Sequence, residues 1–226
     1  MNKPITLSYS SISLFLECPR CFWLDKVRGI KRPPNIMPTL PSGMDEVIKK
    51  HFDRFRQSGI LPPELRGKIE GTLVSDQELL EIWRNWKKGI RYTDPATQAV
   101  LMGALDDCLI LDDAYIPLDY KTRGYPIRDN THTYYQNQLD TYTLLLAENG
   151  YNHLSYGYLL FFHPLECTDQ GQVRFHAEPV RVQTEPERAR QIFLSAVDVL
   201  SKEETPEVGP KCRHCPWAQQ ITLPAL

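Results

Sequence analysis

Apolar residues recur at two different spacings along the chain, and the changes between them mark the expected helices and strands. Spacings of three and four residues predict amphipathic helices, which are expected over residues 8–17, 42–56, 75–86, 133–148 and 184–200. Alternating or continuous apolar runs predict strands, which are expected over residues 103–106, 116–121, 154–162 and 172–183. Strands and helices mixed in this way along one chain indicate an α/β fold.

Capping and turn residues mark several of these boundaries. Ser8 is available as the N-cap of the first helix, and residues 75–78 and 184–187 have the composition of capping boxes. Gly150 ends the fourth helix, and residues 112–113, both aspartate, form the expected turn between the first two strands. The basic stretch over residues 26–32 leads into a proline-rich linker through Pro41, which is read as a solvated loop with DNA-phosphate contact as the alternative.

Composition places the chain among ordinary soluble globular proteins. Its 226 residues, 42% hydrophobic and 24% charged, fit a single domain over residues 1–226. The formal net charge of −2 does not indicate a nucleic-acid-binding protein, so any affinity for DNA must come from a local basic region and a metal. The sequence shows no signal-peptide pattern and no apolar run near the roughly 20 residues of a membrane helix, which predicts a cytoplasmic location without a membrane partner.

Acidic and basic residues follow the apolar residues of the two central strands. The first strand carries Asp106, and the second carries Asp119 and Lys121. Residues i and i+2 of a strand share a face, so Asp119 and Lys121 can address one small volume while Tyr120 points away. Two carboxylates there suit Mg²⁺ or Mn²⁺, and the lysine can orient an attacking water. This combination predicts phosphodiester hydrolysis.

An isolated Asp-x-Lys is a short pattern that also occurs on solvated hairpins. Here the apolar residues 116–118 lead directly into the acid, which favours the end of a core strand. On the following helix, Gln138 and Tyr142 stand four residues apart and therefore share a face.

Four of the six cysteines form two C-x₂-C pairs, at the two ends of the chain. Two such pairs supply four thiolates, enough for one Zn²⁺ or for a 4Fe-4S iron-sulfur cluster. We expect residues 1–30 and 205–220 to form this cluster region, with Cys18, Cys21, Cys212 and Cys215 as ligands. Cys108 is read as a core residue and Cys167 as a loop residue.

The order Gly-x-x-Asp, hairpin, Asp-x-Lys and then a helix with Gln-x-x-x-Tyr resembles the RecB-like branch of the PD-(D/E)XK nuclease superfamily, which includes the CRISPR-associated RecB-like exonucleases. The segment Cys-Pro-Arg-Cys-Phe-Trp-Leu at residues 18–24 resembles the N-terminal segment of the same branch. The resemblance implies a restriction-endonuclease-like fold, with a mixed central sheet flanked by helices and the two termini joined at the four-cysteine metal cluster.

The resemblance also implies roles for individual residues. Asp106 and Asp119 would bind the metal together with the backbone carbonyl of Tyr120, Lys121 would be catalytic, and Gln138 and Tyr142 would contribute to the site and to DNA contact. Asp106 is chosen over Asp107 by the Gly-x-x-Asp count. A metal-binding histidine on an early helix would be His51, for which a surface histidine is an equal alternative.

For the cysteines, the resemblance implies a structural 4Fe-4S cluster, although the spacing alone favours Zn²⁺. The family's pattern has one N-terminal and three C-terminal cysteines, whereas this chain has two and two, so Cys21 would replace the missing ligand. Beside the catalytic strand, Arg123, Tyr125 and Arg128 are candidates for DNA binding, and an ordinary surface loop is the alternative.

The expected function is a divalent-metal-dependent DNA nuclease. The resemblance implies an exonuclease acting on single-stranded or frayed DNA with free ends, in DNA repair and recombination or in CRISPR adaptation, with protein partners from those pathways. One alternative is a non-catalytic iron-sulfur or zinc protein that binds DNA or serves as an adaptor. Another is an endonuclease that cuts internal sites, which would need a separate recognition module, and we expect the chain to be too short for one.

Overall fold

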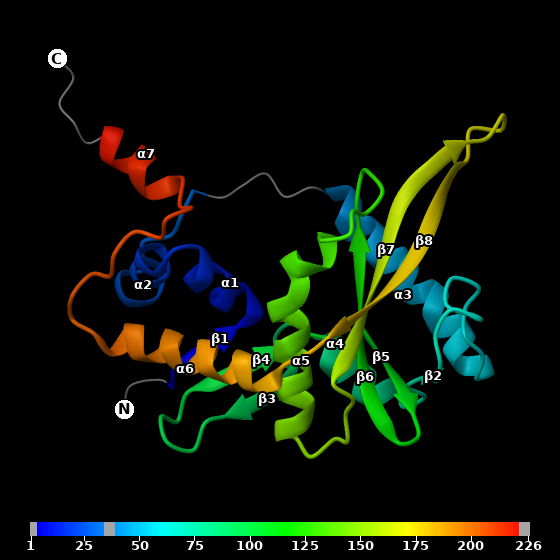
Figure 1. Cartoon of the computed structure of the whole chain (residues 1–226), viewed down its shortest axis with the longest axis horizontal. Coiled ribbons are helices and arrows are strands. Elements are labelled where there is room, and N and C mark those ends of the chain that lie inside the picture. The colour runs from blue at the N-terminus through cyan, green and yellow to red at the C-terminus, as the bar shows by residue number, and fades with distance from the viewer. Residues whose placement is uncertain (1–3, 34–38, 222–226) are drawn as a thin grey trace. The chain divides into compact units, whose positions relative to one another are not determined.

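The computed structural model describes residues 4–33 and 39–221 and divides the chain into two compact units (Figure 1). The central unit consists of Met37–Tyr92 and Gly103–Ala189, and the terminal unit consists of Met1–Ile36, Thr93–Met102 and Arg190–Leu226. In the described part of the chain, no helix combines the length and the apolar character needed to cross a membrane.

The central unit is built on a five-stranded mixed sheet. Its strands are β2 (Thr72–Leu73), β5 (Asp107–Leu111), β6 (Ala114–Thr122), β7 (Tyr156–Cys167) and β8 (Val173–Gln183), in this spatial order. The β6–β7 pair is parallel and the other pairs are antiparallel. Asp112 and Asp113 join β5 to β6 with φ values of 47° and 63°, as in a two-residue hairpin turn, so the predicted turn is confirmed.

Helices of the central unit pack on both faces of this sheet. They are α3 (Thr39–Ser58), α4 (Gln77–Arg84), the short η1 (Thr131–Tyr135) and α5 (Gln136–Glu148). Phe52 of α3 packs with Leu118 and Tyr120 of β6, whereas Leu139 of α5 meets Gly157 of β7 from the other side. The predicted α/β fold with a mixed sheet flanked by helices is thereby confirmed.

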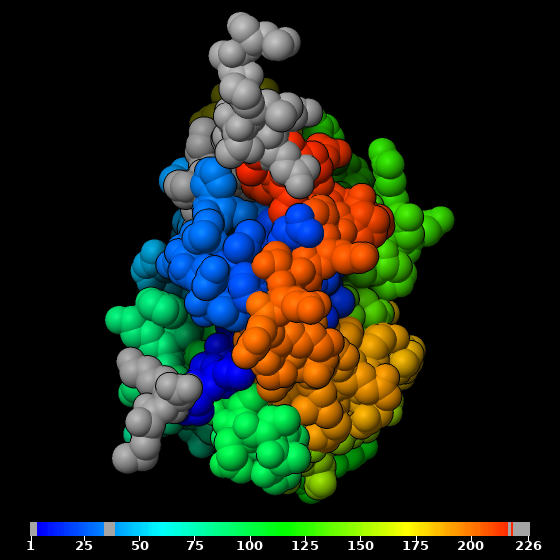
Figure 2. Space-filling model, turned by 90° about the vertical axis from the view of Figure 1, so that its left-hand side faces the viewer, coloured from blue at the N-terminus to red at the C-terminus, as the bar shows by residue number. Residues whose placement is uncertain are grey.

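The terminal unit brings the two ends of the chain together. Its elements are β1 (Thr6–Ser8), α1 (Tyr9–Glu17), α2 (Pro19–Arg28), most of β4 (Val100–Gly103) and α7 (His214–Ile221), and β1 pairs with β4 in parallel. The helix α6 (Pro186–Ser201) begins in the central unit and ends in the terminal one, and β3 (Ile90–Thr93) precedes β4. Figure 2 shows the blue N-terminal segment beside the orange and red C-terminal segment, and Trp23 donates a hydrogen bond of 3.1 Å to the carbonyl of Lys202.

Several predicted boundaries differ from the structure. Asp106 lies in the loop between β4 and β5 rather than inside a strand. Asp76, not Ser75, caps α4, because its carboxylate accepts from the amide of Leu79 at 2.9 Å. Since α4 ends at Arg84, Trp86 is 74% exposed and does not pack on the core.

The other differences concern loops. Of the expected proline-rich linker, residues 34–38 lie outside the described residues, and Pro41 stands in the first turn of α3, where proline is tolerated. Cys167 is the last residue of β7 rather than a loop residue, whereas Cys108 is buried as predicted. The hairpin of β7 and β8 extends beyond the buried part of the sheet, and its outer residues are exposed (Figure 1).

Candidate active site

The strand β6 places Asp119 and Lys121 on the sheet face that is turned toward α5. Tyr120 lies on the opposite face, where its ring packs against Phe52 with 4.8 Å between the ring centres. The alternation of side chains along β6 therefore separates the residues as the sequence predicts.

The carboxylate of Asp119 is buried and is contacted from two elements. Its Oδ1 accepts a hydrogen bond of 2.9 Å from Nε2 of Gln138, and its Oδ2 forms an ion pair with the ammonium of Lys121. The same nitrogen of Gln138 lies 2.7 Å from the hydroxyl of Tyr142, which in turn donates to the carbonyl of Ala104 at 2.8 Å. The structure thus brings together four of the predicted residues.

Gly103 allows this approach of α5. A Cβ atom at Gly103 would lie 2.8 Å from Cδ1 of Leu145 and 3.1 Å from the ring of Tyr142, which is closer than packed atoms tolerate. The first residue of Gly-x-x-Asp is therefore a packing requirement, because it lets the tyrosine reach the backbone just before Asp106.

Burial and the charge of Asp106 raise the pKa of Asp119 to about 7, although Lys121 acts in the opposite direction. For Lys121, burial lowers the pKa, but the attraction of Asp119 outweighs this effect and the net shift is upward. The ammonium of Lys121 also lies 4.9 Å from the ring centre of Tyr135, at the start of α5. Lys121 is therefore protonated, and it neutralises only part of the negative charge.

Asp106 lies close enough to Asp119 to influence its ionisation and has contacts of its own. Its Oδ2 accepts from the backbone amide of Tyr120 at 3.1 Å, and its Oδ1 lies 2.8 Å from the ammonium of Lys49 on α3. The guanidinium of Arg84 donates to the backbone carbonyl of Asp106 at 2.7 Å. The amide of Tyr120 donates to Asp106 and its hydroxyl donates to Asp107, and a ligand role for its carbonyl stays a prediction.

The neighbouring Asp107 belongs to a different environment. It is fully buried, and its Oδ2 receives Arg56 at 2.6 Å, Arg84 at 3.1 Å and the hydroxyl of Tyr120 at 2.6 Å. These contacts leave Asp107 in a buried charge network and Asp106 beside Asp119. The choice of Asp106 by residue count agrees with this arrangement.

His51 contacts Glu64 and Phe55 rather than Asp106. Its Nε2 lies 3.1 Å from a carboxylate oxygen of Glu64, and its ring packs against Phe55 with 5.0 Å between the ring centres. On the same helix it is Lys49 that contacts Asp106. A ligand role for His51 stays a prediction that these contacts do not support.

The candidate DNA-binding residues Arg123, Tyr125 and Arg128 line one surface pocket in the loop after β6. Tyr134 of η1 lines the same pocket, and Tyr125 and Tyr134 are 80% and 75% exposed. Two exposed tyrosines beside two arginines provide ring faces and positive charge within one depression of the surface.

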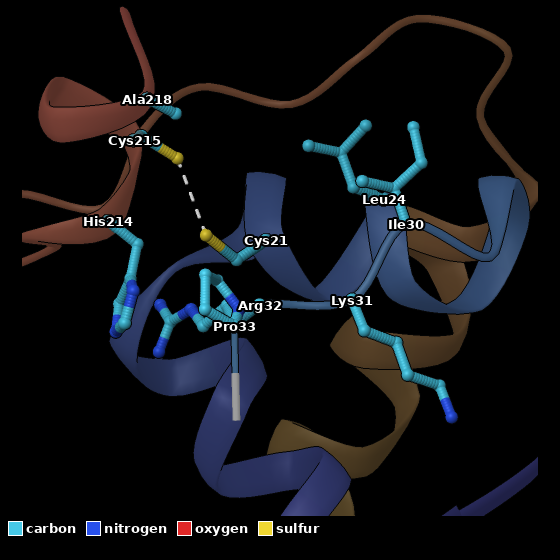
Figure 3. A pocket seen from close by; sticks show the side chains of 9 residues that line it. All are labelled: Cys21, Leu24, Ile30, Lys31, Arg32, Pro33, His214, Cys215 and Ala218. Atoms are coloured by element: carbon cyan, nitrogen blue, oxygen red, sulfur yellow. Dashed lines mark hydrogen bonds between the residues drawn. The ribbon is translucent and has the colours of Figure 1, made fainter. Parts of the chain in front are cut away.

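The four cysteines of the two C-x₂-C pairs converge in the terminal unit, with all four sulfur atoms within 4.8 Å of one another. Cys21 lies 3.3 Å from Cys215 and 3.7 Å from Cys212 between sulfur atoms, and Cys18 lies 3.9 Å from Cys215. Figure 3 shows the sulfur atoms of Cys21 and Cys215 facing each other at the edge of a pocket. The predicted convergence of the two ends at four cysteines is confirmed.

Backbone amides and an arginine surround these sulfur atoms. In each pair the amide of the second cysteine points to the sulfur of the first at 3.5 Å, and the amide of Gly209 donates to Cys18 at 3.3 Å. Arg32 lies 3.6 Å from the sulfur of Cys212 and 2.8 Å from Glu17. A side chain at Gly209 would collide with the carbonyl of Glu17, 2.1 Å from its Cβ.

The thiols differ in their ease of ionisation. Burial raises the pKa of Cys21. Burial also opposes the ionisation of Cys212, but hydrogen bonds from the Cys215 backbone and the Cys18 side chain outweigh it and lower the pKa of Cys212 to about 7. Four sulfur donors at these distances can hold a thiophilic metal.

Several residues beside the sites were not singled out from the sequence: Asp45, Lys49, Arg56, Arg84, Tyr134 and Arg32. For Lys49 the sequence does contain a signal, since Asp45 precedes it by one helical turn on a face next to the apolar stripe of α3. For the arginines the signal is tertiary, because their partners are distant in the sequence.

Comparison with known proteins identifies the class that this site belongs to. The site gathers two carboxylates and a lysine, a set of groups that can hold a divalent metal ion and orient a water molecule. The family model of the PD-(D/E)XK nuclease superfamily matches residues 78–220, more than half of the chain, and the chain belongs to this superfamily. The matched range contains Asp106, Asp119 and Lys121, and members of the superfamily are typically nucleases that use divalent metals.

Other comparisons add little to this assignment. No curated protein matches the chain significantly. Among solved structures, the crystal structure of SSO0001 is similar over 99% of this chain and 88% of the other, with 12% sequence identity and a TM-score of 0.46.

Proposed function

We propose that the chain is a divalent-metal-dependent DNA nuclease of the RecB-like branch, folded as one nuclease domain, with its active site in the central unit. The observation that supports this most is the contact set around Asp119, which joins Lys121 and Gln138 to a buried acid with Asp106 nearby. The buried Oδ2 of Asp119 is contacted by the ammonium of Lys121, so a positive charge already lies against this oxygen. Such an oxygen suits a cation.

Asp106 and Asp119 would hold Mg²⁺ or Mn²⁺ through oxygen. The resemblance implies the Tyr120 carbonyl and His51 as further ligands, but the contacts of His51 with Glu64 and Phe55 do not support its role. A bound divalent ion would activate water and offset the charge that develops on the phosphate. Lys121, kept protonated by Asp119, would orient the water and neutralise part of that charge. Gln138 fixes the orientation of the Asp119 carboxylate, and Tyr142 fixes Gln138.

For the substrate we propose single-stranded or frayed DNA with free ends. Tyr125 and Tyr134 expose ring faces on which unpaired bases can stack, and Arg123 and Arg128 of the same pocket can pair with phosphates. An exonuclease with this preference would act in DNA repair and recombination or in CRISPR adaptation, with protein partners from those pathways. The alternative is a non-catalytic DNA-binding or adaptor protein. That alternative gives the contact between Lys121 and Asp119 no function.

For the four cysteines we propose a structural metal centre that ties the two ends of the chain. One tetrahedral Zn²⁺ with Zn–S bonds of about 2.3 Å spaces its sulfurs about 3.8 Å apart. Three of the sulfur distances, 3.3 to 3.9 Å, lie around this value, and all four sulfurs lie within 4.8 Å of one another. A 4Fe-4S cluster, which the resemblance implies, spreads its thiolates farther because each binds a different iron. The spacing therefore favours Zn²⁺.

The activity is tested with end-labelled linear and circular DNA, single- and double-stranded, in the presence of Mg²⁺ or Mn²⁺. The natural protein is expected to degrade linear single strands, and Lys121→Ala is expected to lose this activity while keeping its fold by circular dichroism. Lys50→Ala is the matched control, because this lysine on α3 is 73% exposed and pairs with the exposed Glu46. Equal inactivity of the natural protein and Lys121→Ala, with DNA binding retained, would favour the adaptor.

The metal at the cysteines is tested separately by elemental analysis and absorbance of protein purified without oxygen. The sulfur spacing predicts a colourless protein with one zinc per chain. A brown protein containing about four irons and an absorbance near about 400 nm would instead establish the iron-sulfur cluster.

A further inference from the structure

Lys49 holds two carboxylates at once. Its ammonium lies 2.8 Å from Oδ2 of Asp45 and 2.8 Å from Oδ1 of Asp106. Asp45 and Lys49 stand one turn apart on α3, whereas Asp106 comes from the loop before β5. The side chain of Lys49 is only 21% exposed, so this contact forms at the edge of the site rather than in open solvent.

The contact occupies the oxygen of Asp106 that a metal would need. The other oxygen, Oδ2, already accepts the backbone amide of Tyr120. Asp119 is in a similar state, because its Oδ1 receives Gln138 and its buried Oδ2 is held by Lys121. The ammonium groups of Lys49 and Lys121 thus each contact the second carboxylate oxygen of a candidate metal ligand, Asp106 and Asp119 respectively.

We infer that the ammonium of Lys49 holds the place of a divalent cation between Asp45 and Asp106, that Asp45 is a third carboxylate of the metal site, and that Lys49 is released when metal binds. The inference rests on the proposed function and deepens it. An ammonium carries one charge and three N–H donors, so it satisfies two carboxylates in the way a metal ion would. Replacing it by a divalent ion adds one positive charge where three carboxylates gather.

The geometry of α3 permits this exchange. Asp45 is 40% exposed and can turn without disturbing the core, and the long side chain of Lys49 can extend into solvent once it is released. His51, in contrast, is held by Glu64 and the ring of Phe55. In this assignment α3 contributes Asp45 to the metal instead of His51.

The next residues on the helix provide a matched control. Glu46 and Lys50 form the same i, i+4 pair with 2.6 Å between nitrogen and oxygen, and their side chains are 68% and 73% exposed. They lie on the same helix and carry the same charges as Asp45 and Lys49, but it is Lys49 and not Lys50 that contacts Asp106. Any effect that depends on the site will therefore appear at the first pair and not at the second.

The experiment measures Mn²⁺ binding to the full chain without DNA, by the electron paramagnetic resonance signal of free Mn²⁺. Lys49→Met is expected to bind Mn²⁺ several-fold more tightly, because the competing cation is gone. Asp45→Asn is expected to bind it about tenfold or more weakly, as for loss of a group that supports a metal site. Glu46→Gln and Lys50→Met are expected to bind as the natural protein does.

A second measurement follows Lys49 directly. Labelling of amines followed by peptide mass spectrometry is expected to show increased modification of Lys49 when Mn²⁺ is added, with Lys50 unchanged. Unaltered Mn²⁺ affinity in Asp45→Asn, or unaltered or weaker affinity in Lys49→Met, would overturn the inference. Asp119→Asn separates this outcome from a failure of the proposed function: if it too binds Mn²⁺ like the natural protein, the metal site itself is misplaced.

Discussion

Gln138 of α5 donates a hydrogen bond of 2.9 Å to Oδ1 of Asp119 on β6. The contact links an amide on a helix to a buried acid on a strand, and these two elements pack against each other. Because the amide occupies one oxygen, the second oxygen of Asp119 faces Lys121. The hydrogen bond from Gln138 therefore fixes the orientation of the Asp119 carboxylate.

Replacing this amide is expected to slow catalysis without preventing folding. A hydrogen bond to a charged group contributes about 1.5–3 kcal/mol, so Gln138→Leu should lower kcat by about 10- to 100-fold. Gln136→Leu is the control: this glutamine also donates 2.9 Å to a buried acid, Asp140, but does not touch Asp119. Equal losses in both variants, measured on end-labelled DNA, would show that the effect arises from helix stability alone.

The raised pKa of Asp119 predicts a pH dependence of metal binding. The pKa of Asp119 in the folded protein, about 7, lies above the ordinary value of 3.8 for this side chain. The protonated acid therefore stabilises the metal-free fold at low pH, and this contribution is lost as the pH rises through about 7. Metal requires the carboxylate, so Mn²⁺ affinity should increase up to about tenfold per pH unit below about pH 7 and then level off. Calorimetric titrations between about pH 5.5 and about pH 8.5 test this dependence. Affinity that is flat across that range would show that Asp119 is already ionised.

The buried charge network around Asp107 predicts a large effect on stability. Asp107→Asn removes the charge that faces Arg56 and Arg84, and breaking a buried pair of this kind costs about 3–5 kcal/mol. Asp53, which contacts both arginines, reduces the cost toward the lower end of that range. Urea unfolding measures it, with Glu166→Gln as the control, because its pair with Arg174 is exposed and should contribute little. A small effect of Asp107→Asn would indicate that water or Asp53 solvates the arginines.

Sequence patterns predicted the parts of the site that depend on local geometry. Asp119 and Lys121 share a face because strand side chains alternate, and Gln138 and Tyr142 meet because they stand one helical turn apart. The four cysteines were predicted to converge because their spacing is typical of metal ligands.

Contacts between distant elements were not predictable in this way. Asp45–Lys49 and Glu46–Lys50 are equivalent as sequence patterns, and only the packing of α3 decides which pair reaches Asp106. Arg56 and Arg84 lie far from Asp107 in the sequence, so their ion pairs with Asp107 depend on how α3 and α4 pack against β5. The end of α4 was also not predictable from the sequence, because helix ends depend on caps and tertiary contacts. The helix ends at Arg84, so Trp86 lies outside it and is exposed.

Loss of one cysteine ligand is expected to weaken the terminal unit. Cys212→Ser should reduce the bound metal and lower the temperature of thermal unfolding, because metal binding contributes directly to folding. Cys167→Ser is the control, since this cysteine is exposed at the end of β7 and does not belong to the four. A strong chelator should lower the unfolding temperature of the natural protein in the same way. Unchanged stability after verified metal loss would show that the centre does not support the fold.

The exposed rings of Tyr125 and Tyr134 predict how the protein holds single strands. Stacking contributes about 1–3 kcal/mol per base, so Tyr125→Ala and Tyr134→Ala should each weaken binding of a short oligonucleotide by about 5- to 150-fold. Trp86→Ala is the control, because Trp86 is 74% exposed but does not line the pocket that the tyrosines share with Arg123 and Arg128. Fluorescence anisotropy with Ca²⁺ in place of Mg²⁺ would measure binding without cleavage. Because stacking is neutral, the tyrosine variants should keep the natural salt dependence, whereas Arg128→Ala should reduce its slope. Equal loss in Trp86→Ala would place the strand elsewhere on the surface.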